Sequence, residues 1–245
     1  MEMDSQLKED SKRGKLILFP VGIGNDNLAT SLPMYNSELL NTCNTFIVEE
    51  LRTARRFLKK AGYVHSIDNT EFYLLNEHTQ DIDIANYLDV IDKGQNIGLL
   101  SEAGLPCIAD PGSKIVRIAH RKNIDIVPLV GPSSLMMALM ASGFNGQNFA
   151  FVGYLPIDKN ERIKAIKKLE EKVFKENQTQ IFIEAPYRNN QLLETLAEVC
   201  SNNTLVCVAC DISIDSQYIK TMPAKKWKTT KENFHKRNTV FLLYK

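Results

Sequence analysis

The alternation of short apolar runs with helical patterns constrains this chain more than any other feature of its sequence. Residues 16–19, 45–48, 96–100 and 124–129 are compact apolar runs of the kind found in buried strands. Between or after them, apolar residues recur at helical spacing in residues 53–61, 82–93, 113–122 and 135–141. Strands that alternate with helices predict a largely parallel sheet with crossover helices, and therefore an α/β fold.

The second half continues the alternation and then changes character. Strands are expected at 149–154, 179–184, 205–212, 217–221 and 239–244, and helices at 161–175 and 189–200. The last connections are short enough for antiparallel pairing, which predicts a mixed second sheet. Glycine, asparagine and glutamine interrupt the pattern at 142–148. We therefore expect a flexible leader at 1–14, an N-terminal domain at 15–146 and a C-terminal domain at 147–245.

Charge and composition exclude several classes of protein. The 30 Lys and Arg residues nearly balance the 29 Asp and Glu residues, for a net charge of +1. The chain thus lacks the strong basic field of proteins that hold nucleic acid by bulk electrostatics, and any RNA contact must come from local basic patches, at 52–60, 164–175 and 225–237. No apolar run approaches a membrane span and no signal peptide is recognisable, so we expect a cytoplasmic protein without a membrane partner.

Cysteine usage gives no metal or redox site. Only Cys207 and Cys210 have CxxC spacing, and they lie in a run that is typical of a buried strand. Because no second pair or histidine cluster completes a tetrahedral set, we expect no metal.

Three loops that follow predicted strands are candidates for ligand binding. They cover Pro20 to Asn25, Ser101 to Gly112, and Gly131 to Ser134. In an open α/β sheet, ligands lie beyond the carboxyl ends of the strands. Small residues in these loops leave the backbone accessible, and Ser133 and Ser134 at a helix start offer donors to a carboxylate. None of the loops has a phosphate-binding GxGxxG or GxxxxGK[ST] pattern.

The order of these motifs resembles that of the tetrapyrrole methylase superfamily, and within it most closely the ribosomal RNA small subunit methyltransferase I branch. The resemblance covers Lys15 to Lys245. Its most specific part runs from Ser101-Glu102-Ala103-Gly104-Leu105-Pro106 to Gly131-Pro132-Ser133-Ser134. The other matching segments are Pro20-Val21-Gly22-Ile23-Gly24-Asn25, Glu49-Glu50-Leu51-Arg52, Asn76-Glu77-His78, Asp110-Pro111-Gly112, Gly153-Tyr154-Leu155-Pro156 and Glu184-Ala185-Pro186-Tyr187-Arg188.

The resemblance implies a homodimer whose subunits hold S-adenosylmethionine in a cleft between two domains. It implies donor contacts from the first domain and, at two strand ends, from the second. The first set is Pro20, Ala103, Gly104, Leu105, Ile108, Ser133 and Ser134, and the second is Ile183 and Ala209.

The acceptor loops depart from the RNA-modifying branch more than the donor loops do. Glu50-Leu51-Arg52 replaces Asp-Thr-Arg, Asn76-Glu77-His78 replaces His-Glu-His, and Cys210-Asp211-Ile212-Ser213-Ile214 replaces Arg-Glu-Leu-Thr-Lys. The leading hypothesis is 2′-O-methylation of a ribose in 16S rRNA, with the small ribosomal subunit as partner. Methylation of a small molecule such as a tetrapyrrole, and a non-catalytic S-adenosylmethionine-binding protein, remain alternatives.

Methyl transfer to a ribose hydroxyl needs alignment and benefits from a base that takes the proton. Glu102 is the first candidate for that base, followed by Glu50 and Glu184, and Arg52 and Arg188 would orient phosphate or carboxylate groups. The alternative is structural: Glu184 would pair with Arg188, and Glu102 would cap a helix. Asp110, before Pro111, is expected to form a turn.

Overall fold

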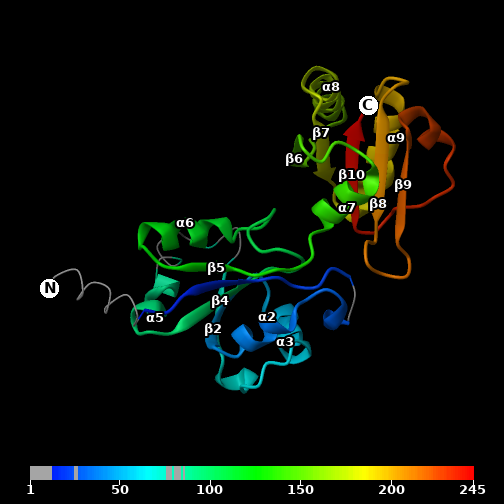
Figure 1. Ribbon diagram of the computed structural model, residues 1–245. Helices are drawn as coiled ribbons and strands as arrows, with labels where there is room; N and C mark the ends of the chain where they lie inside the picture. Colours follow the sequence, from blue (N-terminus) through cyan, green and yellow to red (C-terminus); the bar gives the residue numbers. More distant parts are fainter. Residues whose placement is uncertain (1–12, 25–26, 76–78, 80–83, 85) are drawn as a thin grey trace. The chain divides into compact units, whose positions relative to one another are not determined.

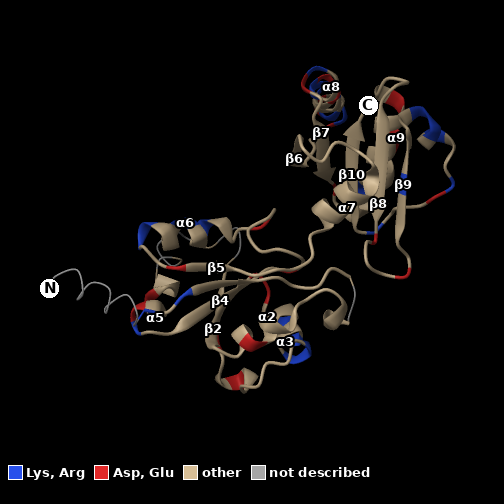
Figure 2. Ribbon diagram, in the orientation of Figure 1, with Lys and Arg blue, Asp and Glu red and all other residues tan. Residues whose placement is uncertain are grey.

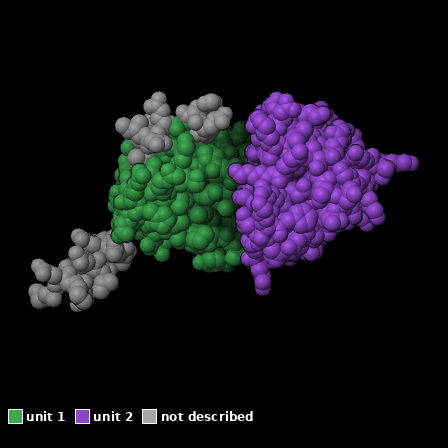
Figure 3. Space-filling view, turned by 90° about the horizontal axis from the view of Figure 1, so that it is seen from above, with its two compact units in different colours: residues 1–132 green, residues 133–245 purple. Residues whose placement is uncertain are grey.

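Figure 1 shows a computed structural model of the chain, which describes residues 13–24, 27–75, 79, 84 and 86–245. The predicted leader therefore lies almost entirely outside the described residues, as do Asn25 and the Asn76-Glu77-His78 motif. The chain divides into two compact units, residues 1–132 and 133–245, which Figure 3 colours separately. This division falls earlier than the expected boundary at 146/147, because the helix that begins at Ser134 packs on the second sheet.

The first unit contains a parallel five-stranded sheet. Its strands are β1 (Leu16–Phe19), β2 (Cys43–Val48), β3 (Glu71–Leu74), β4 (Asn96–Leu100) and β5 (Ile126–Pro128), in the order β3-β2-β4-β1-β5. Every neighbouring pair is parallel, so all five carboxyl ends lie at one edge. The strand β3 was not predicted from the sequence, because its residues lie at the edge of the sheet and are at most partly buried.

Helices cover both faces of this sheet (Figure 1). Those described are α2 (Met34–Leu40), α3 (Leu51–Lys60), α5 (Asp89–Asp92) and α6 (Ser113–Arg121), with the short 3₁₀ turns η2 (Leu28–Thr30) and η3 (Ile67–Asn69). Alternating strand residues feed two cores: Leu16 packs with the α5 and α6 side, whereas Ile17 packs with the α2 and α3 side. A strand that is buried on both faces has a continuous apolar sequence, which is why β1, β2 and β4 could be predicted.

The second unit contains a mixed five-stranded sheet. Its strands are β6 (Phe149–Tyr154), β7 (Thr179–Ile183), β8 (Leu205–Cys210), β9 (Tyr218–Pro223) and β10 (Thr239–Tyr244), in the order β6-β7-β10-β8-β9. Only β6 and β7 are parallel, and the remaining pairs are antiparallel, as the short final connections predict. The predicted fold class, a parallel first sheet and a mixed second sheet, is confirmed.

Three helices and two 3₁₀ turns accompany the second sheet. They are α7 (Ser134–Ser142), α8 (Lys159–Glu176), α9 (Asn189–Val199), η4 (Pro186–Arg188) and η5 (Ala224–Thr229). The α8 and α9 side encloses the main core, in which the Phe182 and Phe241 rings stack with centroids 6.0 Å apart. Cys207 and Cys210 are buried free thiols of β8, which confirms their interpretation as residues of a buried strand.

The described residues contain neither a membrane-spanning helix nor a cluster of metal-ligating side chains. Among these residues, no helix combines the length and apolar character that crossing a membrane requires. The same residues contain no cluster of three or more His, Cys, Asp or Glu side chains suited to a metal ion.

Candidate functional site

The loops after β1, β4 and β5 meet at the carboxyl edge of the first sheet. Val21 and Gly104 exchange two backbone hydrogen bonds, of 2.8 and 3.0 Å, which join the loop after β1 to the loop after β4. At Gly131, after β5, an added Cβ would lie 2.1 Å from Cβ of Pro20. Glycine at 131 is therefore required for the close approach of the first and third loops.

The loop between β4 and α6 is held in an unusual backbone conformation by one carboxylate. Gly104, Cys107 and Ala109 have φ values of 70°, 70° and 62°, a left-handed region that costs energy for residues other than glycine. The Asp110 carboxylate accepts hydrogen bonds from the amides of Cys107 (2.8 Å) and Gly112 (2.7 Å). Burial raises the Asp110 pKa, while these amides act to lower it. The prediction that Asp110 forms a turn is confirmed.

The joined loops present backbone and small apolar side chains to solvent. Ala103 is exposed, Ile108 is 49% exposed and Val130 is 75% exposed, whereas Gly104 and Pro20 are buried and Leu105 is half-buried. Exposed apolar side chains on a backbone-lined loop suit a ligand with a flat apolar part and groups that bond to amides and carbonyls. The residues present therefore fit an adenosine-containing donor.

Ser133 and Ser134 begin α7. The Ser133 side chain caps the helix by accepting a hydrogen bond from the amide of Met136 at 3.4 Å. Both serines are half-buried. Their position at the start of a helix that follows Pro132 matches the sequence prediction, and their proposed contact with the donor stays a prediction.

Glu50, predicted as a base, forms the cap of α3. Its two carboxylate oxygens accept hydrogen bonds from the amides of Arg52 (2.8 Å) and Thr53 (2.7 Å). These bonds lower the Glu50 pKa, so the group stays ionised and is a weak proton acceptor. Arg52 is exposed in the first turn of the same helix.

Glu102 joins the loop after β4 to the first turn of α3. Its Oε1 accepts a hydrogen bond of 2.7 Å from the hydroxyl of Thr53. Glu102 is itself exposed. From the sequence, Glu102 was expected either to act as a base or to cap a helix. In the structure Glu50 caps α3, and Glu102 bonds to the Thr53 side chain in the first turn of that helix.

Glu49 was not among the candidate bases predicted from the sequence. It follows β2 directly, is half-buried, and accepts a hydrogen bond from the backbone amide of Glu102. Burial, with the nearby charges of Asp110 and Glu102, raises the Glu49 pKa to about 7. A signal was present in the sequence, since a carboxylate directly after a buried strand of a parallel sheet lies at the ligand-binding edge.

The second unit brings together the remaining predicted residues at one edge of its sheet. Ile183 and Ala209 lie on either side of Val240 in the strand register, so they form one row across β7, β10 and β8. Glu184 accepts two hydrogen bonds from Arg188, at 3.0 and 2.5 Å, and its side chain is 1% exposed. The Glu184–Arg188 pair, which the sequence offered as the structural alternative to a catalytic role, is confirmed. Both hydrogen bonds from Arg188 and the one from the Ala185 amide end on Oε1 of Glu184, and Oε2 has no hydrogen-bond partner among the described residues.

An apolar cavity of about 190 Å³ lies elsewhere in the first unit, between η2, α2 and α3. Phe19, Leu40 and Phe57 are among its walls. Of the predicted site residues, only Pro20 lines it, so this cavity is not formed by the joined loops.

Comparison with known proteins assigns the chain to a family. The profile of the tetrapyrrole (corrin/porphyrin) methylases matches residues 15–227. Ribosomal RNA small subunit methyltransferase I of Escherichia coli O157:H7 is 28% identical over 98% of this chain and 81% of its own length. The protein of that name in Leptospira borgpetersenii is 32% identical over 84% of this chain and 78% of its own length.

Solved structures show the same fold. The methyltransferase CobJ has a TM-score of 0.63 at 16% identity, and the cobalt precorrin-4 methyltransferase CbiF has a TM-score of 0.58 at 14% identity, each over 94% of both chains. The predicted resemblance is therefore confirmed by both sequence and fold. The joined loops at the sheet edge, the family profile over most of the chain and these relatives establish that the chain is a methyltransferase of the tetrapyrrole (corrin/porphyrin) methylase family.

Proposed function

We propose that this chain transfers a methyl group from S-adenosylmethionine to the 2′-oxygen of a ribose in 16S rRNA of the small ribosomal subunit. The observation that carries the proposal is the similarity over nearly the whole chain to proteins named ribosomal RNA small subunit methyltransferase I. We also propose, from the family resemblance, that it acts as a homodimer in the cytoplasm.

The donor contacts remain those expected from the sequence. The joined loops would bind the donor through Pro20, Ala103, Gly104, Leu105 and Ile108, with the Val21–Gly104 hydrogen bonds and the Asp110 carboxylate holding these loops in place. Ser133 and Ser134 would donate to its carboxylate. Ile183 and Ala209 would contribute from the second sheet. When bound, the donor supplies an electrophilic methyl carbon, so the protein mainly aligns the acceptor and excludes water.

Glu49 is the best candidate for the group that accepts the ribose proton. Glu50 is committed to the α3 cap and Glu184 to Arg188. The Glu102 amide holds the Glu49 carboxylate beside the β4 loop, and a pKa of about 7 matches the range in which a general base works best. Glu102, the first candidate from sequence, would then position Glu49 through its backbone amide, and Arg52 and Arg188 would orient phosphates.

The test is transfer of tritiated methyl from S-adenosylmethionine to small ribosomal subunits that lack the modification. The matched control is the Ser133→Ala/Ser134→Ala double variant, with donor affinity measured by calorimetry. Label in 16S rRNA that depends on the serines supports the proposal. Label transferred to a uroporphyrinogen-like tetrapyrrole and not to the subunit would favour the small-molecule alternative. Donor binding without formation of S-adenosylhomocysteine on any acceptor would favour a binding protein.

A further inference from the structure

Two tyrosines stand out at the edge of the second sheet where β6 and β7 end. Tyr154 is 61% exposed and Tyr187 is 60% exposed. They are the two most exposed aromatic residues of this unit, whose Phe182, Trp227, Phe234 and Phe241 are buried and whose next most exposed rings are Phe174 at 42% and Phe149 at 38%. Exposed aromatic rings that gather at a ligand-binding edge indicate a contact surface.

The ring of Tyr187 is fixed in place by an ion pair. The Arg188 guanidinium lies 5.3 Å from the ring centroid of Tyr187, and its Nη1 donates to the Tyr187 hydroxyl at 3.4 Å. Glu184 holds the same guanidinium through two hydrogen bonds, with Arg188 only 15% exposed. Because the support beneath the ring is rigid, Tyr187 presents its ring to solvent at little cost in side-chain entropy.

A β-bulge turns Tyr154 toward the same edge. In the β6–β7 register Phe151 pairs with Ile181 and Tyr154 with Ile183, so β6 contains one extra residue. Gly153, inside this bulge, has a φ of 71°. Tyr154 pairs in register with Ile183, the last residue of β7, and Glu184, which follows directly, holds the Arg188 guanidinium against the Tyr187 ring.

The loop before β10 brings His235 and Lys236 next to the Tyr187 segment. The amide of Lys236 donates to the carbonyl of Pro186 at 2.8 Å, and Nδ1 of His235 lies 3.2 Å from the carbonyl oxygen of Tyr187. Asn189 anchors this loop by donating to the carbonyls of Phe234 and Arg237. His235 and Lys236 are exposed, whereas Arg237 is bonded to Asp211.

We propose that Tyr154 and Tyr187 stack on unpaired bases of an RNA acceptor, and that Lys236 and His235 contact its phosphates. This proposal rests on the proposed function and names the surface through which the second unit holds RNA. Sequence-tolerant binding of single strands combines aromatic rings with positive charge along the backbone, and both are present here. A base inside a duplex offers no free face, so the platform selects unpaired nucleotides.

The experiment measures binding of a fluorescent, unpaired RNA oligonucleotide to the full chain by anisotropy. Tyr187→Ala should weaken RNA binding by about 5- to 150-fold, the range expected for loss of one base stack. Tyr187→Phe keeps the ring and should bind normally. The matched control is Phe174→Ala, which removes a 42% exposed aromatic ring from the far end of α8.

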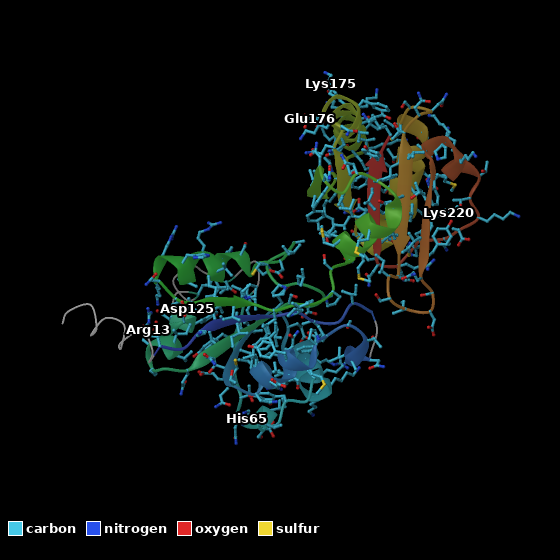
Figure 4. The ribbon with its side chains drawn as sticks, in the orientation of Figure 1. Arg13, His65, Asp125, Lys175, Glu176 and Lys220 are labelled. Carbon is cyan, nitrogen blue, oxygen red and sulfur yellow. The ribbon has the colours of Figure 1, made fainter. Side chains whose placement is uncertain are left out.

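The charge component is tested separately by salt dependence. Lys236→Gln should reduce the slope of log affinity against log salt by about 0.7 to 1, as expected for one lost phosphate contact. Lys220→Gln is the matched control, because Lys220 lies on β9 and points away from the sheet (Figure 4).

Two outcomes would overturn the proposal. The first is unchanged RNA binding in Tyr187→Ala and in Lys236→Gln. The second is weaker donor binding in calorimetry with RNA binding intact, which would assign the tyrosines to the donor. RNA binding is measured without turnover, so the two proposals can fail separately. If the chain binds RNA through these tyrosines but methylates no ribosomal particle, the proposed reaction is refuted and the RNA-binding surface is not.

Discussion

Replacement of Glu49 by glutamine tests whether this residue accepts the proton. The change keeps the size of the side chain and an oxygen that can accept from the Glu102 amide, and it removes only the basic carboxylate. A general base contributes about 10²- to 10⁴-fold to a rate, so the single-turnover rate should fall by about that factor.

The dependence on pH gives a sharper expectation. With a Glu49 pKa of about 7, the carboxylate should be about one-tenth ionised at pH 6 and about nine-tenths ionised at pH 8. The wild-type rate should therefore rise about tenfold across this range and level off above it. The Glu49→Gln rate should not change with pH.

The assay is single-turnover methyl transfer at saturating donor and acceptor over this range of pH. Glu50→Gln is the matched control, since Glu50 is adjacent in sequence and caps α3. It should be less stable by about 1 kcal/mol, the usual value of a cap, and should retain the wild-type pH profile. A Glu49→Gln enzyme that keeps both its rate and its rise around pH 7 would refute the reasoning.

Three further predictions concern stability and donor binding. Because the fold raises the pKa of Glu49 and so disfavours its charged form, the free energy of unfolding should fall as pH rises from about 4.5 to about 7. In urea titrations Glu49→Gln should abolish this fall, and an equal fall in the variant would contradict the assignment. Gly131→Ala places a Cβ 2.1 Å from Cβ of Pro20, so it should lower stability by about 1–3 kcal/mol and weaken donor binding. Gly146→Ala, whose Cβ meets nothing within 4 Å, should do neither when the two variants are compared by thermal melting and calorimetry. Asp110→Ala leaves the amides of Cys107 and Gly112 without their acceptor, so it should lower stability by about 1–3 kcal/mol and weaken donor binding as the loop relaxes. Unchanged donor affinity in calorimetry would show that the loop holds its shape without the carboxylate.

Surface charge explains why net charge says little about an RNA substrate. Figure 2 shows Lys and Arg gathered on α3, on α8 and around η5, with Asp and Glu distributed between them. On α8, Lys164 pairs with Glu161, and Lys175 pairs with Glu171. Two of the five lysines in the basic patch at 164–175 are therefore paired within their own helix, so the count of lysines overstates the charge offered to RNA.

The sequence alone determined the fold class and the positions of the three candidate loops. The strands at 96–100, 149–154 and 239–244 were predicted with the observed bounds. Glycine and proline marked the loops, because close backbone approach and left-handed conformations demand particular residue types. The helix α2 was missed, since Met34–Leu40 buries only Asn36 and Leu40 and so shows no clear helical period.

Only the tertiary structure decided which of the two carboxylates has a raised pKa. Glu49 and Glu50 are adjacent and chemically identical in the sequence. In the fold, Glu50 accepts two amide hydrogen bonds that keep it ionised, while Glu49 lies half-buried near Asp110 and Glu102, from a different part of the chain. A pKa depends on burial and on neighbouring charges, and neither is fixed until β2 and β4 pair and bring those residues together.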